Sequence, residues 1–116
     1  MIEAVWAYVV KEEARTRFEL AFGPGGVWSQ GVARAEGFRG TTLLCDTRNP
    51  SRFLVIDLWD SEAQWIHTKP AHDTLRARLE EWVESATEVG VFRIRSQGTV
   101  RPLGTPRKRQ GRGAAG

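Results

Sequence analysis

The fold is decided by the stretch Arg52-Phe-Leu-Val-Ile-Asp-Leu-Trp-Asp-Ser-Glu-Ala-Gln-Trp-Ile-His67. Its first half is an apolar run closed by a tryptophan, which is typical of a β-strand. Ser61 is followed three residues later by Gln64, a capping-box pattern that begins a helix. We therefore predict a strand over residues 52–59 that leads directly into a helix.

Before this stretch the hydrophobic pattern changes twice. Residues 2–10 alternate and are dense in Val, Trp and Tyr, which predicts a strand. Residues 11–22 change to a helical period, with apolar side chains at Ala14, Phe18 and Phe22. Gly23-Pro-Gly-Gly26 must break that helix, because proline lacks an amide donor and glycine favours turns. A second short helix is predicted to follow, with Trp28, Val32 and Ala35 on one side.

The remaining segments complete the pattern. Residues 38–47 read as a strand, and the turn residues at 46–51 join it to the strand at 52–59 as an antiparallel hairpin. Pro70 should stop or kink the helix that begins at Ser61. The helix should then resume with an apolar stripe, and residues 89–95 form the last strand. That stripe consists of Leu75, Leu79, Trp82, Val83 and Ala86.

The predicted order is β-α-β-β-α-β, which makes the fold class α+β and ferredoxin-like. Four antiparallel strands carry both helical segments on one face of the sheet. No helical segment remains for the other face, so we expect it to be buried against the same face of a second subunit. The sequence thus predicts a two-fold homodimer.

Charge divides the chain into a body and a tail. The net charge is +3, but residues 96–116 hold five basic residues and no acid, which leaves −2 on residues 1–95. We predict one domain over 1–95 and a basic, Gly/Pro-rich, disordered tail over 96–116. The tail has no aromatic residue to stack on bases, so nucleic-acid binding is not expected.

The length of the apolar runs and the number of cysteines indicate where in the cell the protein is expected. Apolar runs such as residues 5–10 are too short to span a membrane, and no signal peptide is visible. Cys45 is the single cysteine and cannot form a disulfide within the chain. We expect a cytoplasmic protein, with Cys45 as a buried strand residue.

Several segments, taken in order, resemble the antibiotic biosynthesis monooxygenase family, in particular a small bacterial branch. The resemblance covers about residues 2–94 and implies a dimeric α+β barrel with a pocket between sheet and helices. Members of this family include cofactor-independent oxygenases, which oxidise aromatic polyketide phenols to quinones, and haem-degrading enzymes. The segments are Gly23-Pro-Gly-Gly-Val-Trp28, Ala35-Glu-Gly-Phe-Arg-Gly-Thr-Thr-Leu-Leu44, Pro50-Ser-Arg-Phe-Leu-Val-Ile-Asp-Leu-Trp-Asp-Ser61 and Val89-Gly-Val-Phe92.

The haem degraders of the family use an Asn, a Trp and a His. When their motif is laid onto Trp59-Asp-Ser61, those positions fall on Trp6, Thr68 and Arg78. None of the three matches, so haem degradation is disfavoured. The resemblance instead implies a cofactor-independent monooxygenase that acts on a planar phenol or hydroquinone with dioxygen, without metal or flavin.

A cofactor-free oxygenase needs a base and an apolar pocket. His67 is the preferred base, since a histidine suits that role at neutral pH and Ala63 and Ile66 beside it are expected to face inward. Asp57 and Tyr8 are further catalytic candidates, because a carboxylate within an apolar strand is unusual. The expected substrate-binding residues are Trp6, Trp59, Trp65, Arg93 and His72.

Each candidate also has an ordinary structural interpretation. The histidines can be half-buried residues with routine hydrogen bonds, Asp57 can form an ion pair with Arg93 or Arg95, and the tryptophans can be core. Neither histidine stands in a metal-ligand pattern, so no metal is predicted. Two other functions therefore stay open: a non-catalytic dimer that binds a small aromatic molecule, and a structural protein whose interior is filled by its own tryptophans.

Overall fold

The computed structural model describes residues 1–23 and 25–98. Most of the predicted basic tail lies outside the described residues. The strands and α-helices follow one another in the order that the sequence predicts, and two short 3₁₀ turns, η1 and η2, are added. The elements are β1 (Ile2–Val10), η1 (Glu12–Ala14), α1 (Arg15–Phe22), α2 (Val27–Val32), β2 (Phe38–Cys45), β3 (Arg52–Trp59), α3 (Glu62–Ala77), η2 (Glu80–Trp82) and β4 (Val83–Arg93).

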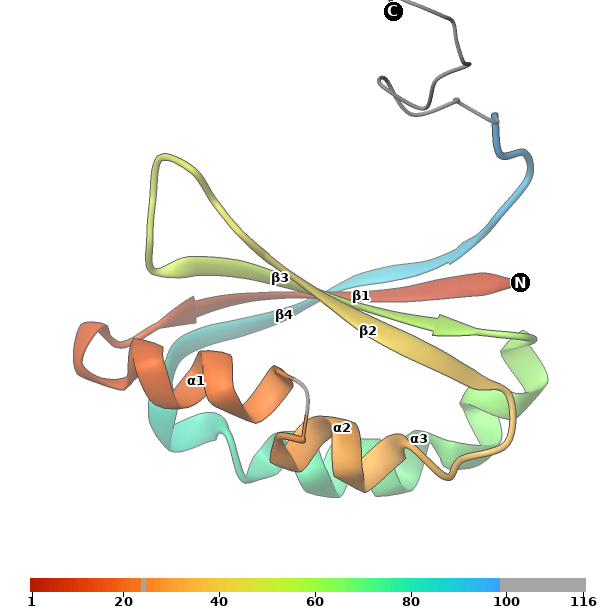
Figure 1. The fold of residues 1–116 in the computed structure, drawn as a ribbon, viewed down its shortest axis with the longest axis horizontal. Helices are drawn as coiled ribbons and strands as arrows, with labels where there is room; N and C mark the ends of the chain where they lie inside the picture. The colour runs from red at the N-terminus through yellow and green to blue at the C-terminus, as the bar shows by residue number, and fades with distance from the viewer. Residues whose placement is uncertain (24, 99–116) are drawn as a thin grey trace, which may run out of the picture.

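The four strands form one antiparallel sheet in the order β2-β3-β1-β4. All three α-helices lie against one face of this sheet, and the other face is bare in Figure 1. This topology confirms the predicted ferredoxin-like α+β fold. The first strand is central, because it pairs with β3 on one side and with β4 on the other.

The core lies between the sheet and the helices. Along β3 the side chains alternate, and Phe53, Val55, Asp57 and Trp59 are buried beneath the helices. The predicted helical stripe of Ala14, Phe18 and Phe22 is buried against the same face. Trp28 and Val32 of α2 complete this cluster, so the two short helices cover the sheet together with α3. The alternation of β3 thus places an aspartate in the middle of an apolar core.

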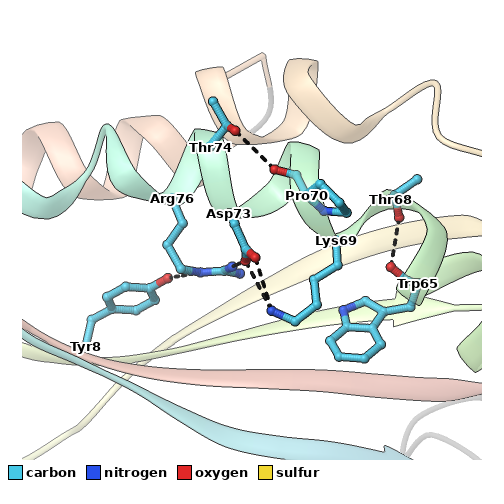
Figure 2. Close-up of polar contacts among 8 residues, drawn as sticks. All are labelled: Tyr8, Trp65, Thr68, Lys69, Pro70, Asp73, Thr74 and Arg76. Atoms are coloured by element: carbon cyan, nitrogen blue, oxygen red, sulfur yellow. Dashed lines mark hydrogen bonds and ion pairs between the residues drawn. The ribbon is translucent and has the colours of Figure 1, made fainter.

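The helix does not stop at Pro70, which was one of the two outcomes predicted there. The helix α3 runs without interruption from Glu62 to Ala77, with Pro70 inside it. Proline removes one backbone donor, but Pro70 is exposed, so the carbonyl one turn earlier can be hydrated. The Thr74 hydroxyl donates to the Pro70 carbonyl at 3.1 Å, as Figure 2 shows.

The predicted extension of that helix through Ala86 is wrong. After α3 ends, Val83 begins β4, and its residues pair with β1: Val83 with Val10, and Ala86 with Tyr8. The spacing of the apolar residues fits a helix, but pairing with the central strand decides their conformation. The last strand therefore starts six residues earlier than predicted.

Cys45 is exposed, whereas the sequence analysis expects it to be buried. It ends β2, which is an edge strand, where the hairpin rises away from α1 (Figure 1). The place of Cys45 at the end of an edge strand therefore decides its exposure, and the apolar neighbours Leu43 and Leu44 do not predict it. Within the described residues no helix is long and apolar enough to cross a membrane.

The start of α3 is fixed by a side-chain cap. Ser61 is the N-cap, and its Oγ accepts the backbone N–H of Gln64 at 3.3 Å. We expect Ser61→Ala to lower the free energy of unfolding by about 1 kcal/mol. Urea unfolding monitored by tryptophan fluorescence measures this loss, and Ser96→Ala, on an exposed residue beyond β4, is the matched control. Equal stability of the two variants would contradict the capping role.

Candidate functional site

A depression of about 330 Å³ lies between α3 and the strands β1 and β4. A larger depression, of about 410 Å³, lies between α1, α2 and Trp82, but it contains none of the predicted site residues. Size alone therefore does not identify a site. The smaller depression is lined by Trp6, Asp73, Arg76, Ala77, Glu80 and Ala86.

Arg76 is the most constrained charged residue at this depression. Its Cζ lies 4.1 Å from the ring centroid of Trp6 and 5.0 Å from that of Trp28, so two indoles flank the guanidinium. Its Nε donates to the Tyr8 hydroxyl at 2.9 Å, and its side chain is only 12% exposed. Figure 2 shows Arg76 reaching from α3 to Tyr8 on β1.

One carboxylate partly balances Arg76. Asp73 Oδ1 lies 3.5 Å from Arg76 Nη1, but the same carboxylate also binds Lys69 Nζ at 3.2 Å. Asp73 is 52% exposed, so water weakens both interactions. Arg76 therefore keeps hydrogen-bonding capacity and positive charge beside the depression.

Trp6 lines the depression next to Arg76, and Tyr8 is buried beside both. Their rings stack with centroids 6.1 Å apart and planes inclined by 22°. Burial raises the pKa of Tyr8, and the neighbouring Arg76 opposes that rise. Tyr8 is thus a neutral phenol at physiological pH, which suits a hydrogen-bonding role better than that of a base.

Asp57 is buried in the core, 3% exposed. Its Oδ1 accepts the indole N–H of Trp28 at 3.1 Å and the hydroxyl of Thr41. Burial raises the pKa of Asp57, while the two hydrogen bonds and the charge of Arg76 act in the opposite direction. The ion pair expected with Arg93 or Arg95 does not form. Instead, Nη2 of Arg93 lies 3.6 Å from Oε1 of Glu62.

His72 is equally buried, between two tryptophan rings. Its ring centroid lies 5.0 Å from that of Trp59 and 5.7 Å from that of Trp28. Burial, with a smaller contribution from Arg76, lowers the pKa of His72 to about 4. Its Nε2 and the Nε1 of Trp59 are buried without a hydrogen-bond partner within residues 1–23 and 25–98.

His67 lies apart from these residues. It is exposed and lines a separate depression of about 290 Å³ together with Glu36, Ala63, Gln64 and Thr68. The expectation that Ala63 and Ile66 face inward is wrong, since both are exposed, Ile66 by 55%. This difference in helix phase is what turns His67 outward.

The structure therefore brings some predicted residues together and separates others. Tyr8 and Trp6 meet at Arg76, and Asp57, Trp59 and His72 lie in the core behind it. His67 and Arg93 contact neither group, and Trp65 is half-buried with Lys69 Nζ 5.8 Å from its ring centroid. Sequence reasoning missed Arg76 and treated Trp28 only as core. Arg76 follows His72 by four residues, a helical spacing that places both on one face.

The arrangement can bind a planar ring that carries an ionised oxygen. Trp6 lines the depression and offers apolar contact to a ring, Arg76 offers directed donors, and the Tyr8 hydroxyl accepts from the Arg76 Nε. Asp73 and Glu80 line the same depression and can accept from hydroxyl groups. In the part of the chain that the structure describes, no three side chains of His, Cys, Asp or Glu are grouped as metal ligands would be.

Comparison with protein families matches residues 1–72 to the model described as antibiotic biosynthesis monooxygenase. A search of curated protein sequences finds no match.

Solved structures with the same arrangement of strands and helices are numerous. A Nitrosomonas europaea protein assigned to the antibiotic biosynthesis monooxygenases has a TM-score of 0.66 and 17% identity, over 84% of this chain and 93% of its own. SnoaB, a cofactor-independent oxygenase from Streptomyces nogalater, in a mutant form, has a TM-score of 0.63 and 22% identity, over 83% and 94%. The Mycobacterium tuberculosis haem degrader MhuD has a TM-score of 0.64 and 18% identity, over 85% and 100%. At such identities the likeness shows a shared fold.

Proposed function

This chain belongs to the antibiotic biosynthesis monooxygenase family, and from that premise we propose that it is a cofactor-independent monooxygenase. Its substrate is a planar phenolic or hydroquinone-type small molecule, and dioxygen is the oxidant. The observation that carries the proposal is Arg76, flanked by Trp6 and Trp28 and nearly buried at the edge of an open depression. A stacked ring with its oxygen at the guanidinium would be held as an anion.

The chemistry needs little beyond that anion. Arg76 lowers the pKa of a bound phenol, so the substrate ionises near neutral pH. The electron-rich anion gives one electron to dioxygen, and the carbon radical and superoxide combine to a peroxide. After it takes up a proton, the peroxide loses water and leaves a new carbonyl group. Dioxygen accepts all four electrons that the substrate loses. One of its oxygen atoms becomes the new carbonyl oxygen, and the other leaves as water with the hydrogen of the oxidised carbon and the added proton.

The identity of the base is a separate question. The sequence favours His67, but that residue is exposed and lines a different depression. Asp57 and His72 are buried in the core, so neither meets a ligand bound in the depression unless the core opens. Arg76 therefore carries the main role in the proposal, and ionisation occurs through solvent. His67→Ala tests this directly: retained activity supports it, and lost activity would make His67 the base.

Oxygen uptake by chelator-treated protein tests the proposed function. With a panel of anthrones, naphthols and hydroquinones, we expect uptake above the spontaneous rate without added metal or flavin. Quenching of tryptophan fluorescence measures binding in the same samples. Binding without uptake would favour the non-catalytic ligand-binding protein, and the absence of both would favour the structural protein.

The haem-degrading alternative finds no support at the corresponding positions. Thr68 uses its hydroxyl to donate to the Gln64 carbonyl, and Arg78 is exposed at the end of α3. Neither residue offers an axial ligand for iron.

We also propose that the bare face of the sheet is the interface of a homodimer. It presents a largely apolar surface, interrupted by Glu3 of β1 between Leu58 and Phe92, in which Leu44 is 44% exposed and Phe92 is 51% exposed. The half-buried Leu54, Ile56 and Leu58 lie between them on β3. A surface of this kind is costly to leave in water, and a second copy offers a matching face.

Ile56→Lys is expected to convert the dimer into a monomer, because two lysines would meet near the centre of the interface. Sedimentation velocity measures the change. Ile66→Lys is the matched control, since Ile66 is exposed on the outer side of α3, and it should remain dimeric. A wild-type chain that sediments as a monomer would contradict the proposal.

A further inference from the structure

The buried carboxylate of Asp57 has a partner that connects it to the depression. Trp28 donates its indole N–H to Asp57 Oδ1, and the face of the same indole lies 5.0 Å from the Cζ of Arg76. Trp28 is fully buried, so it has no freedom to reorient without disturbing the core. One aromatic ring therefore contacts a carboxylate at its edge and a guanidinium at its face.

This geometry couples the two charges. A carboxylate that accepts the indole N–H adds electron density to the ring, and the attraction between the ring face and a cation depends on that density. Asp57 and Arg76 also attract each other directly across the core. Both effects hold the guanidinium toward Trp28.

From this arrangement we infer that Asp57 is a positioning residue, which acts through Trp28 to hold Arg76 at the depression. It does not touch the ligand and does not take a proton from it. This explains why an acidic residue occurs within the apolar strand β3, where an ion pair with an arginine of β4 was the expected arrangement. Only the effect expected on kcat and KM rests on the proposed function; the role of Asp57 in positioning Arg76 does not.

The position of Arg76 can be read without turnover. Its Nε–H donates to the Tyr8 hydroxyl next to the Trp6 ring. We therefore expect this proton to exchange slowly with water and to give an NMR signal shifted by the ring. In both Asp57→Asn and Trp28→Phe we expect exchange of this proton to be about tenfold faster. Asp60→Asn, which removes the partner of the exposed Arg39, is the matched control and should leave the signal unchanged.

The kinetic consequence separates a positioning role from that of a base. In Asp57→Asn we expect the Kd of 2-hydroxyanthraquinone, a phenol that is not oxidised further, and the KM of the substrate to rise about tenfold, with kcat within about twofold. Loss of a general base would instead lower kcat by about 100-fold or more.

Two results would overturn the inference: an unchanged Arg76 signal in both variants, or a large loss of kcat with unchanged ligand affinity. Trp28→Phe keeps the test valid if Asp57→Asn does not fold. A wild-type protein without oxygen uptake removes the proposed reaction, but the NMR signal and the ligand Kd still decide the role of Asp57.

Discussion

Replacing Arg76 with methionine is expected to lower kcat/KM for oxygen uptake by about 100-fold or more. Methionine keeps a flexible apolar side chain between Trp6 and Trp28 but removes every donor that faces the bound oxyanion. The phenol then stays protonated, and the electron-rich form that reduces dioxygen does not accumulate. Steady-state oxygen consumption, measured against a substrate titration, gives both kinetic parameters.

Two further variants make this result specific. Arg76→Lys keeps the positive charge but loses the planar fork and its bond from Nε to Tyr8, so an intermediate activity is expected. Arg34→Met removes an arginine from an exposed position after α2 and should behave as wild type. Full activity in Arg76→Met would remove the central residue of the proposed mechanism.

Acidification should weaken the fold through His72. Because the folded protein holds the pKa of His72 at about 4, below its ordinary 6.5, the fold favours the neutral ring. This stabilisation is complete above pH 6.5 and is lost as the pH falls toward 4. Between these values His72 binds a proton in the unfolded chain but stays neutral in the folded one. The expected decrease in the free energy of unfolding over this range is about 3 kcal/mol.

Urea titrations at several pH values measure this decrease, and His72→Phe isolates it. Phenylalanine keeps a flat ring between Trp28 and Trp59 but cannot be protonated, so the pH dependence should be smaller by the same amount. Asp57 contributes with the opposite sign, because its raised pKa favours the fold at low pH, and it is common to both proteins. His67→Phe, on the exposed side of α3, should keep the wild-type slope, and identical slopes in all three proteins would refute the assignment.

The strands were predictable where local pattern and pairing agree. The predicted bounds of β1 and β3 match the structure, since their alternating residues are buried on one face and paired on both sides. The segment 83–86 was mistaken for helix, because its apolar spacing fits both states and only its distant partner, β1, decides between them.

The candidate site was harder to predict for a related reason. Ser61 gives the start of α3, but the phase of its buried face depends on the angle at which the helix lies on the sheet. A phase set by Ala63 and Ile66 turns His67 inward, whereas the observed phase buries His72 and brings Arg76 to the sheet. Arg76 carries no sequence signal of its own; its importance arises from Trp6 and Trp28, which lie far away along the chain.

The central position of β1 also bears on how the molecule assembles. Among the described strands β1 is synthesised first, but its neighbour β4 (Val83–Arg93) is synthesised after every other described element. Closing so long a loop is entropically costly and slow, so docking of β4 is expected to be the late event in folding. Until then one edge of β1 has unpaired amides that a strand of another chain can capture. Refolding yield should therefore depend on protein concentration more steeply than stability does.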